Sequence, residues 1–161
     1  DLGFDDQGRQ YDKDGNLKDW WTAEDAKNFE ARAAVMANFF DSIEVAPGVH
    51  ANGEFTLGEN IADHGGLQVS YQAFKKATAA APLKIENGFT PEQRFFLSYA
   101  NVWAGNIRPE EILKRTKTDP HSLGKWRVDG ALPQIGAWYE AFNITEKDPM
   151  YLPVDKRVSI W

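Results

Sequence analysis

Two carboxylates set four residues apart are the feature of the sequence with the clearest chemical potential. Glu59 and Asp63 lie in the segment Gly58-Glu59-Asn60-Ile61-Ala62-Asp63-His64-Gly65-Gly66. On a helix this spacing stacks both side chains on one face, where their repulsion destabilises the helix by roughly 0.2–0.5 kcal/mol. A divalent cation with an imidazole beside it would compensate. A solvated acidic helix face is the alternative, and these residues alone leave both interpretations open.

If the pair serves a metal, the two carboxylates would have different roles. In a zinc site with two histidines and one glutamate, the carboxylate is the third protein ligand and water takes the open position. A second carboxylate one turn away can accept a hydrogen bond from the far nitrogen of a ligating histidine. This division predicts Glu59 as the ligand and Asp63 as the group that orients a ligand.

The elements that would position these residues are helices. Cap residues and apolar side chains at spacings of three and four predict helices over about 22–43, 56–81, 90–103, 109–117 and 133–142. Gly65-Gly66 is expected to interrupt or bend the second of these helices, or to allow close approach. No alternating stretch is long enough for a sheet. The chain is therefore predicted to be mainly α, with irregular loops at both ends.

Composition limits the class of protein. With 161 residues, 42% of them hydrophobic and 13% aromatic, the chain can build the core of one domain. A net charge of −6 with dispersed basic residues argues against a nucleic-acid partner. The absence of cysteine excludes disulfides and thiolate zinc sites. No apolar run reaches the about 20 residues of a membrane-spanning helix, so no membrane segment is expected.

The acidic segment also resembles a known signature. Glu59-Asn60-Ile61-Ala62-Asp63 followed by Gly65-Gly66 is similar to the pattern found downstream of the His-Glu-x-x-His helix in the neprilysin/endothelin-converting-enzyme family of zinc metallopeptidases. Further similar motifs are Gly3-Phe4-Asp5-Asp6, Gly15-Asn16-Leu17, Asp19-Trp20-Trp21, Asn52-Gly53, Phe95-Phe96, the stretch from Trp103 to Arg108-Pro109, Asp119 to Arg127, and Val158 to Trp161. The resemblance covers residues 1–161. It implies a single piece, the C-terminal helical part of a thermolysin-like gluzincin catalytic domain.

The resemblance also implies roles for individual residues. Glu59 would be a zinc ligand and Asp63 its supporting carboxylate. The family's matching residues suggest that His121 donates a hydrogen bond to the oxyanion and that Arg127 holds a substrate main-chain carbonyl. Such a donor can contribute roughly 10²–10³ in rate, and a guanidinium suits carbonyl oxygens. Without the resemblance, a histidine that follows a proline is more often a turn or packing residue. His64 and His50 are expected to be solvated.

Part of the expected machinery is missing from the sequence. The three histidines stand at 50, 64 and 121, so no pair has the spacing of His-Glu-x-x-His. Leu2 stands where the second zinc histidine of the family would precede Gly3. We expect a chain that starts after the motif, and a degenerate homologue is the alternative. By itself the chain should bind zinc weakly or not at all and hydrolyse nothing, because two ligands and the general base are absent.

The function expected for the parent protein is zinc-dependent hydrolysis of oligopeptides, with one zinc ion and cleavage on the amino side of large apolar residues, as the family prefers. Val35, Ile144 and Val158 replace cysteines of mammalian relatives, which suggests a bacterial oligoendopeptidase O-like member. A periplasmic or extracytoplasmic location is favoured over a cytoplasmic one. One alternative is a catalytically inactive peptide-binding or interaction module. Another is an unrelated helical domain, which Glu59 and His121 lying far apart would support.

Overall fold

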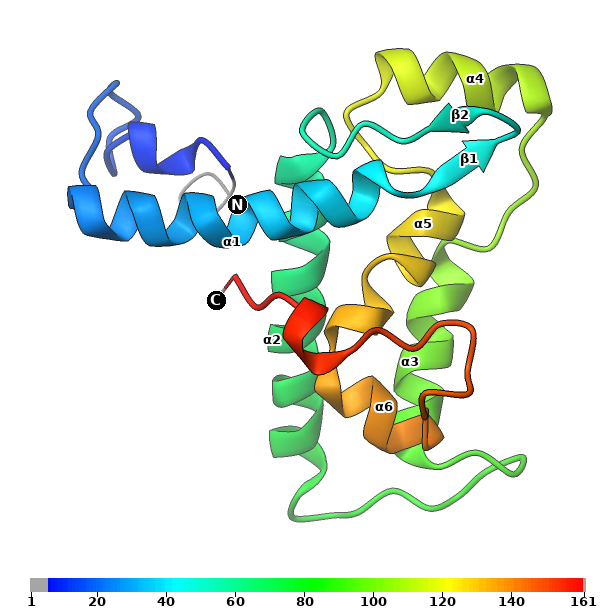
Figure 1. The fold of residues 1–161 in the computed structure, drawn as a ribbon. Helices are drawn as coiled ribbons and strands as arrows, with labels where there is room; N and C mark the ends of the chain where they lie inside the picture. The colour runs from blue at the N-terminus through cyan, green and yellow to red at the C-terminus, as the bar shows by residue number, and fades with distance from the viewer. Residues whose placement is uncertain (1–5, 161) are drawn as a thin grey trace. The chain divides into compact units, whose positions relative to one another are not determined.

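The computed structural model describes residues 6–160 and is mainly helical, as the sequence predicts (Figure 1). The expectation about Leu2 and the motif match at Gly3-Phe4-Asp5 fall outside the described residues. In chain order the elements are η1 (Gly8–Gln10), α1 (Ala23–Asp41), β1 (Glu44–Ala46), β2 (Val49–His50), α2 (Leu57–Thr78), α3 (Pro91–Val102), α4 (Pro109–Thr118), α5 (Gly124–Asp129), η2 (Leu132–Gln134), α6 (Gly136–Phe142) and η3 (Val154–Lys156). Among the described helices, none combines the length and the apolar character that crossing a membrane requires.

The chain forms two compact units. The first contains the residues up to Asp63, the segment Ile107–Leu123 and the residues from Val158 onward. The second contains His64–Asn106 and Gly124–Arg157. Helix α2 begins in the first unit and ends in the second, and each unit is described by itself.

Two of the helix starts follow the predicted cap chemistry. The Thr22 side chain accepts a hydrogen bond from the backbone N–H of Asp25 at 3.1 Å before α1. Before α3, Thr90 and Gln93 form a reciprocal capping box, with bonds of 3.0 and 3.2 Å, and Pro91 occupies the first helical position. These bonds satisfy backbone donors that have no partner inside the helix.

The first unit is built around α1. The predicted apolar stripe of this helix is buried, and it consists of Phe29, Ala33, Met36 and Phe40. An antiparallel ribbon of β1 and β2 follows α1 and turns at Gly48, whose φ is +72°. Helix α4 lies against this ribbon (Figure 1). No sheet is expected from the sequence, because strands of three and two residues carry too little alternation to indicate this ribbon.

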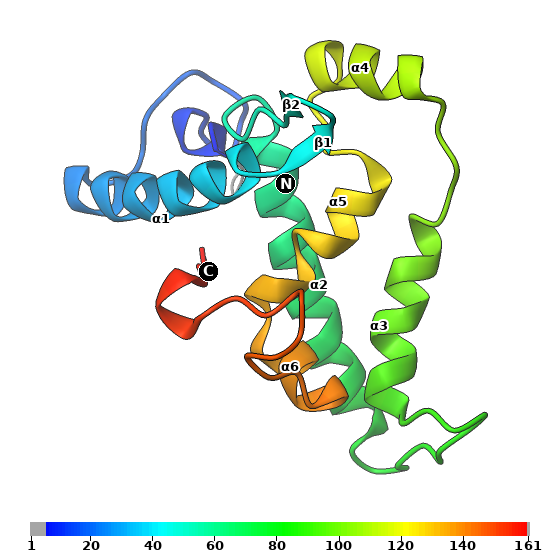
Figure 2. The same ribbon diagram turned by 45° about the vertical axis from the view of Figure 1, so that its right-hand side comes forward.

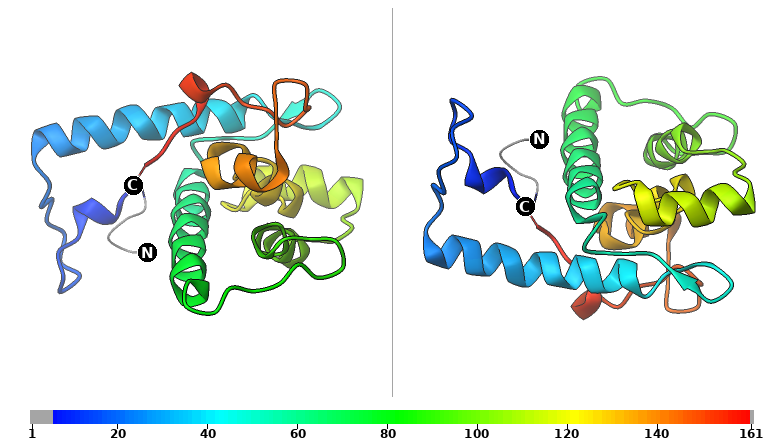
Figure 3. Two further views of the ribbon diagram at one scale, coloured as in Figure 1. Left: turned by 90° about the horizontal axis from the view of Figure 1, so that it is seen from below. Right: turned by 90° about the horizontal axis from the view of Figure 1, so that it is seen from above.

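The C-terminal residues belong to the same unit. Val158 and Ile160 are buried, and Arg32 of α1 donates to the carbonyl oxygen of Ile160 at 3.1 Å. Figure 3 shows this segment passing beside α1. The predicted irregular tail is therefore fixed to α1 at its end.

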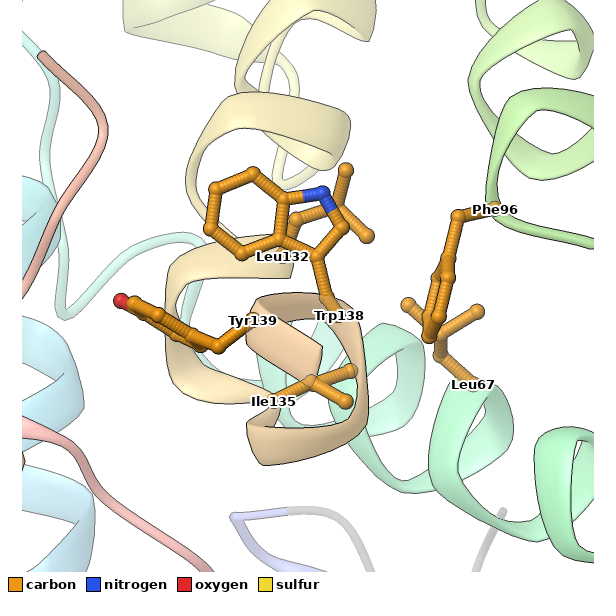
Figure 4. Packing of buried hydrophobic residues seen from close by; sticks show 6 residues of the cluster. All are labelled: Leu67, Phe96, Leu132, Ile135, Trp138 and Tyr139. Atoms are coloured by element: carbon orange, nitrogen blue, oxygen red, sulfur yellow. The ribbon is translucent and has the colours of Figure 1, made fainter. Parts of the chain in front are cut away.

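The second unit has an aromatic core. Helices α3 and α6 pack together (Figure 2), and six buried side chains form the core cluster drawn in Figure 4, namely Leu67, Phe96, Leu132, Ile135, Trp138 and Tyr139. The ring of Tyr71 stacks on that of Phe96 with centroids 5.2 Å apart. Ala77 continues the apolar spacing of Leu67, Tyr71 and Phe74 along α2, but it is exposed. The predicted helix over 133–142 is divided into η2 and α6.

The effect of glycine on the backbone differs from the prediction at Gly65-Gly66 and at Gly53. Helix α2 runs without a break through Gly65-Gly66, and a Cβ added at Gly66 would meet nothing within 4 Å. The expected interruption is therefore wrong, and so is close approach at Gly66. Close approach occurs instead at Gly53, where an added Cβ would lie 1.9 Å from the carbonyl oxygen of Ala37 in α1.

Alanine at these two glycines should have opposite effects on stability. Gly53→Ala should lower the free energy of unfolding by about 2 kcal/mol or more, because the backbone of α1 must move. Gly66→Ala should raise it by up to about 1 kcal/mol, because alanine favours the helix. Thermal and denaturant unfolding of the full-length protein measure both changes. Equal effects of the same sign would contradict the steric argument.

Candidate active site

Glu59 lies in the first turn of α2, and the preceding loop determines where that helix begins. The Asn52 side chain accepts from the backbone N–H of Phe55 at 2.9 Å, and the backbone N–H of Asn60 donates to the carbonyl of Thr56 at 3.0 Å. A helix N-terminus favours a carboxylate electrostatically. The Glu59 side chain is 40% exposed. Asp63 follows one turn later on the same helix and is partly buried.

His121 lies in the loop after α4, and its imidazole approaches Glu59. The distance from Nε2 of His121 to Oε2 of Glu59 is 3.3 Å, so the two form an ion pair whenever the imidazole is protonated. Both residues belong to the first unit. The structure therefore brings together two residues that the sequence analysis assigned to one site, and they are not on separate surfaces.

Asp119 fixes the imidazole from its other side. One oxygen, Oδ1, accepts from the backbone N–H of His121 at 3.0 Å and lies 2.7 Å from Nδ1 of the ring. These two interactions, the backbone one first, hold the pKa of Asp119 below its usual value. The carboxylate is thus ionised and orients the ring with Nδ1–H toward it. No role for Asp119 is predicted from the sequence, although an aspartate two residues before a histidine can form such a turn.

Arg127 lies in α5 of the second unit, an element that the sequence analysis did not predict. Its guanidinium carbon Cζ is 3.9 Å from the ring centroid of Trp103, and its carbonyl oxygen accepts from the Tyr99 hydroxyl at 2.8 Å. Gly124 allows α5 to start close to α3, because an added Cβ would lie 2.9 Å from the carbonyl oxygen of Trp103. Six residues are too few for a periodic apolar pattern, so the sequence carried little signal for this helix.

Glu59 fits the part of a metal ligand, but it does not complete a metal site. Within residues 6–160, no group of three or more His, Cys, Asp or Glu side chains could hold a metal ion. Glu59 offers a carboxylate oxygen of the kind that zinc accepts, in a place where an imidazole already approaches it. A zinc site built on Glu59 would need further ligands from outside the described residues.

The two remaining histidines differ from one another. His50 is exposed, as expected, and its Nδ1 lies 3.2 Å from the carbonyl oxygen of Asp41. The expectation that His64 is solvated is wrong, because this side chain is 1% exposed. Its Nε2 lies 2.9 Å from the Gln68 side-chain nitrogen, and burial lowers its pKa to about 4. The spacing of three from Ile61 and three to Leu67 could have indicated this buried face.

Comparison with known proteins supports the resemblance that the motifs suggest. The chain matches the sequence model of Peptidase family M13 over residues 2–158. It is 39% identical to neprilysin of Homo sapiens over 164 residues, which cover 99% of this chain and 22% of that protein. It is 41% identical to endothelin-converting enzyme 1 of Bos taurus over 150 residues, which cover 91% of this chain and 20% of that enzyme.

Solved structures agree with the fold. The zinc metalloprotease Zmp1 of Mycobacterium tuberculosis, in complex with inhibitor, superposes with a TM-score of 0.93 and 37% identity, over 99% of this chain and 25% of that one. PepO from Lactobacillus rhamnosis HN001 gives a TM-score of 0.85 and 35% identity, over 99% of this chain and 24% of that one. The chain therefore spans about a fifth to a quarter of the proteins that it matches.

Burial of His64 should make stability depend on pH. Because the folded pKa is about 4 and the ordinary value is 6.5, the unfolded state takes up the proton first as pH falls. Stability should therefore drop between pH 6.5 and 4, by up to about 3 kcal/mol. Denaturant unfolding at pH 7 and pH 4.5 measures this effect. Between these two pH values, the free energy of unfolding should fall less for His64→Gln than for the natural protein. His50→Gln is the control, and its free energy of unfolding should fall with pH as much as that of the natural protein. An equal fall for all three proteins would exclude this role of His64.

Proposed function

Because this chain belongs to Peptidase family M13, we propose that the protein containing it is a zinc-dependent endopeptidase that hydrolyses oligopeptides. The 3.3 Å separation of His121 Nε2 and Glu59 Oε2 carries the proposal, since it pairs a carboxylate that can bind a metal with a proton donor. The proposal concerns the longer protein, because this chain spans about a fifth of its curated relatives.

In this proposal the two acidic residues of α2 serve the metal. Glu59 would supply one oxygen ligand, and Asp63, one turn further on, would accept a hydrogen bond from a ligating histidine. The chemistry that zinc would supply there is polarisation of the scissile carbonyl and activation of water. The remaining ligands and the general base would come from residues outside the described ones.

His121 and Arg127 would act on the substrate. A proton on Nε2 of His121 would be donated to the negative charge that develops on the carbonyl oxygen, which is most useful when the donor is already in place. Asp119 keeps the ring oriented through the 2.7 Å contact to Nδ1. Arg127, whose guanidinium lies on the face of Trp103, would bind a main-chain carbonyl of the peptide.

The ligand role of Glu59 is tested in the full-length protein by Glu59→Ala. We expect loss of most bound zinc, measured by metal analysis, and more than about a 100-fold loss of oligopeptide hydrolysis. Glu54→Ala is the control, since Glu54 is exposed in the loop before α2. Hydrolysis that survives Glu59→Ala would refute the ligand assignment. Natural protein that binds zinc and peptides without cleaving them would favour the inactive peptide-binding module.

Removal of the Asp119 carboxylate should slow the chemical step more than it weakens binding of the peptide substrate. Asp119→Ala frees the His121 ring, so kcat should fall by at least about 10-fold with little change in KM. Asp148→Ala is a matched control, because Asp148 makes a comparable local bond to the backbone N–H of Thr145 at 2.8 Å. A KM increase with constant kcat would show that Asp119 contributes to substrate binding instead.

A further inference from the structure

A series of uncharged hydrogen bonds, buried at its centre and partly buried at both ends, includes the residues that follow Glu59 and His121. The Ser122 hydroxyl donates to Oδ1 of Asn60 at 2.8 Å, Nδ2 of Asn60 donates to Oγ1 of Thr56 at 3.0 Å, and the Thr56 hydroxyl donates to the carbonyl oxygen of Asn52 at 3.0 Å. Asn60 is 4% exposed and Thr56 is 6% exposed. These four residues are called the Asn60 relay below, and all of them belong to the first unit.

The direction of each bond in the Asn60 relay follows from proton count. Thr56 has one hydroxyl proton, which it gives to Asn52, so its oxygen must accept from the amide nitrogen of Asn60. This leaves the amide oxygen of Asn60 for Ser122, which can only donate to it. Asparagine suits this place because it both donates and accepts. Aspartate would lack the donor and would add a buried carboxylate directly after Glu59.

The Asn60 relay connects helix α2, which carries Glu59, with the loop that carries His121. Asn60 follows Glu59 directly, and Ser122 follows His121 directly. The contacts of Asp119 with His121 lie within the loop, so they orient the ring without fixing the distance of the loop from α2. The bond from Ser122 to Asn60 does cross from the loop to α2.

We propose that Asn60 and Ser122 are positioning residues that hold His121 at its place opposite Glu59. The inference rests on the proposed function, in which His121 donates to the developing oxyanion. Such a donor must be in place before the reaction, and a displacement of about 1 Å can lower a rate by about 100-fold. The bond from Ser122 to Asn60 resists displacement, because Asn60 is 4% exposed and breaking the bond would take this donor away from its buried amide oxygen.

The direct test is Ser122→Ala in the full-length protein. We expect kcat to fall by about 10-fold, the effect of losing one net hydrogen bond from the transition state, with unchanged KM and zinc content. Ser70→Ala is a matched control on α2, because its hydroxyl donates only locally, to the carbonyl of Leu67 at 3.1 Å. The pair Ser122→Thr and Ser122→Val separates the hydroxyl from side-chain volume, and only the threonine variant should retain kcat.

A double-mutant cycle separates this inference from the proposed function. Ser122→Ala should lower kcat by less than about 2-fold when His121→Ala is already present, because the relay acts through His121. The same 10-fold loss in both backgrounds would overturn the inference. The inference would also be overturned if Ser122→Ala or Ser122→Val kept the natural kcat while His121→Ala lowered kcat. An unimpaired His121→Ala enzyme would instead remove the oxyanion role in the proposed function, and the inference with it.

Discussion

The position of the first turn of α2 depends on a backbone contact that leaves no room for a side chain. Gly53 lies so close to the Ala37 carbonyl that an added Cβ would be 1.9 Å from its oxygen, and the N–H of Gly53 donates to Asp41 at 2.6 Å. The loop that leads into α2 is thereby held against α1. The loop ends at Thr56, and Glu59 follows three residues later. The place of the Glu59 side chain therefore depends on how closely the backbone at Gly53 packs against the backbone of α1.

The candidate site places an imidazole between two carboxylates. The Glu59 carboxylate, the His121 imidazole and the Asp119 carboxylate follow each other at 3.3 and 2.7 Å. The carboxylate of Asp119 is supplied by the same loop as the imidazole, whereas that of Glu59 comes from a helix far away in sequence. Asp119 therefore orients the His121 ring within the loop, whereas the tertiary structure brings the ring close to Glu59. Arg127 belongs to the second unit, where the indole of Trp103 gives its guanidinium a flat support.

Much of this arrangement was predictable from the sequence, and the failures have physical causes. Thr22 and Thr90 were recognisable as caps because their bonds are local. Glu59 and His121 could be assigned to one site only through the resemblance, since no local rule brings together segments so far apart. Burial of His64 is hard to predict, because a polar side chain is expected in solvent even where, as here, it lies between the buried Ile61 and Leu67. Asn60 and Ser122 lie within motifs of the resemblance, but nothing local indicates the bond between them, because it exists only in the folded chain.

The uncharged character of the Asn60 relay has a consequence for the conditions under which the site stays assembled. Attraction between the partly exposed Glu59 carboxylate and a protonated His121 would weaken as ionic strength rises, because dissolved salt screens it. The hydrogen bonds among Ser122, Asn60 and Thr56 join neutral groups, so dissolved salt weakens them much less. We therefore expect the loop to keep its place beside α2 in concentrated electrolyte, where attraction between charges alone would no longer hold it.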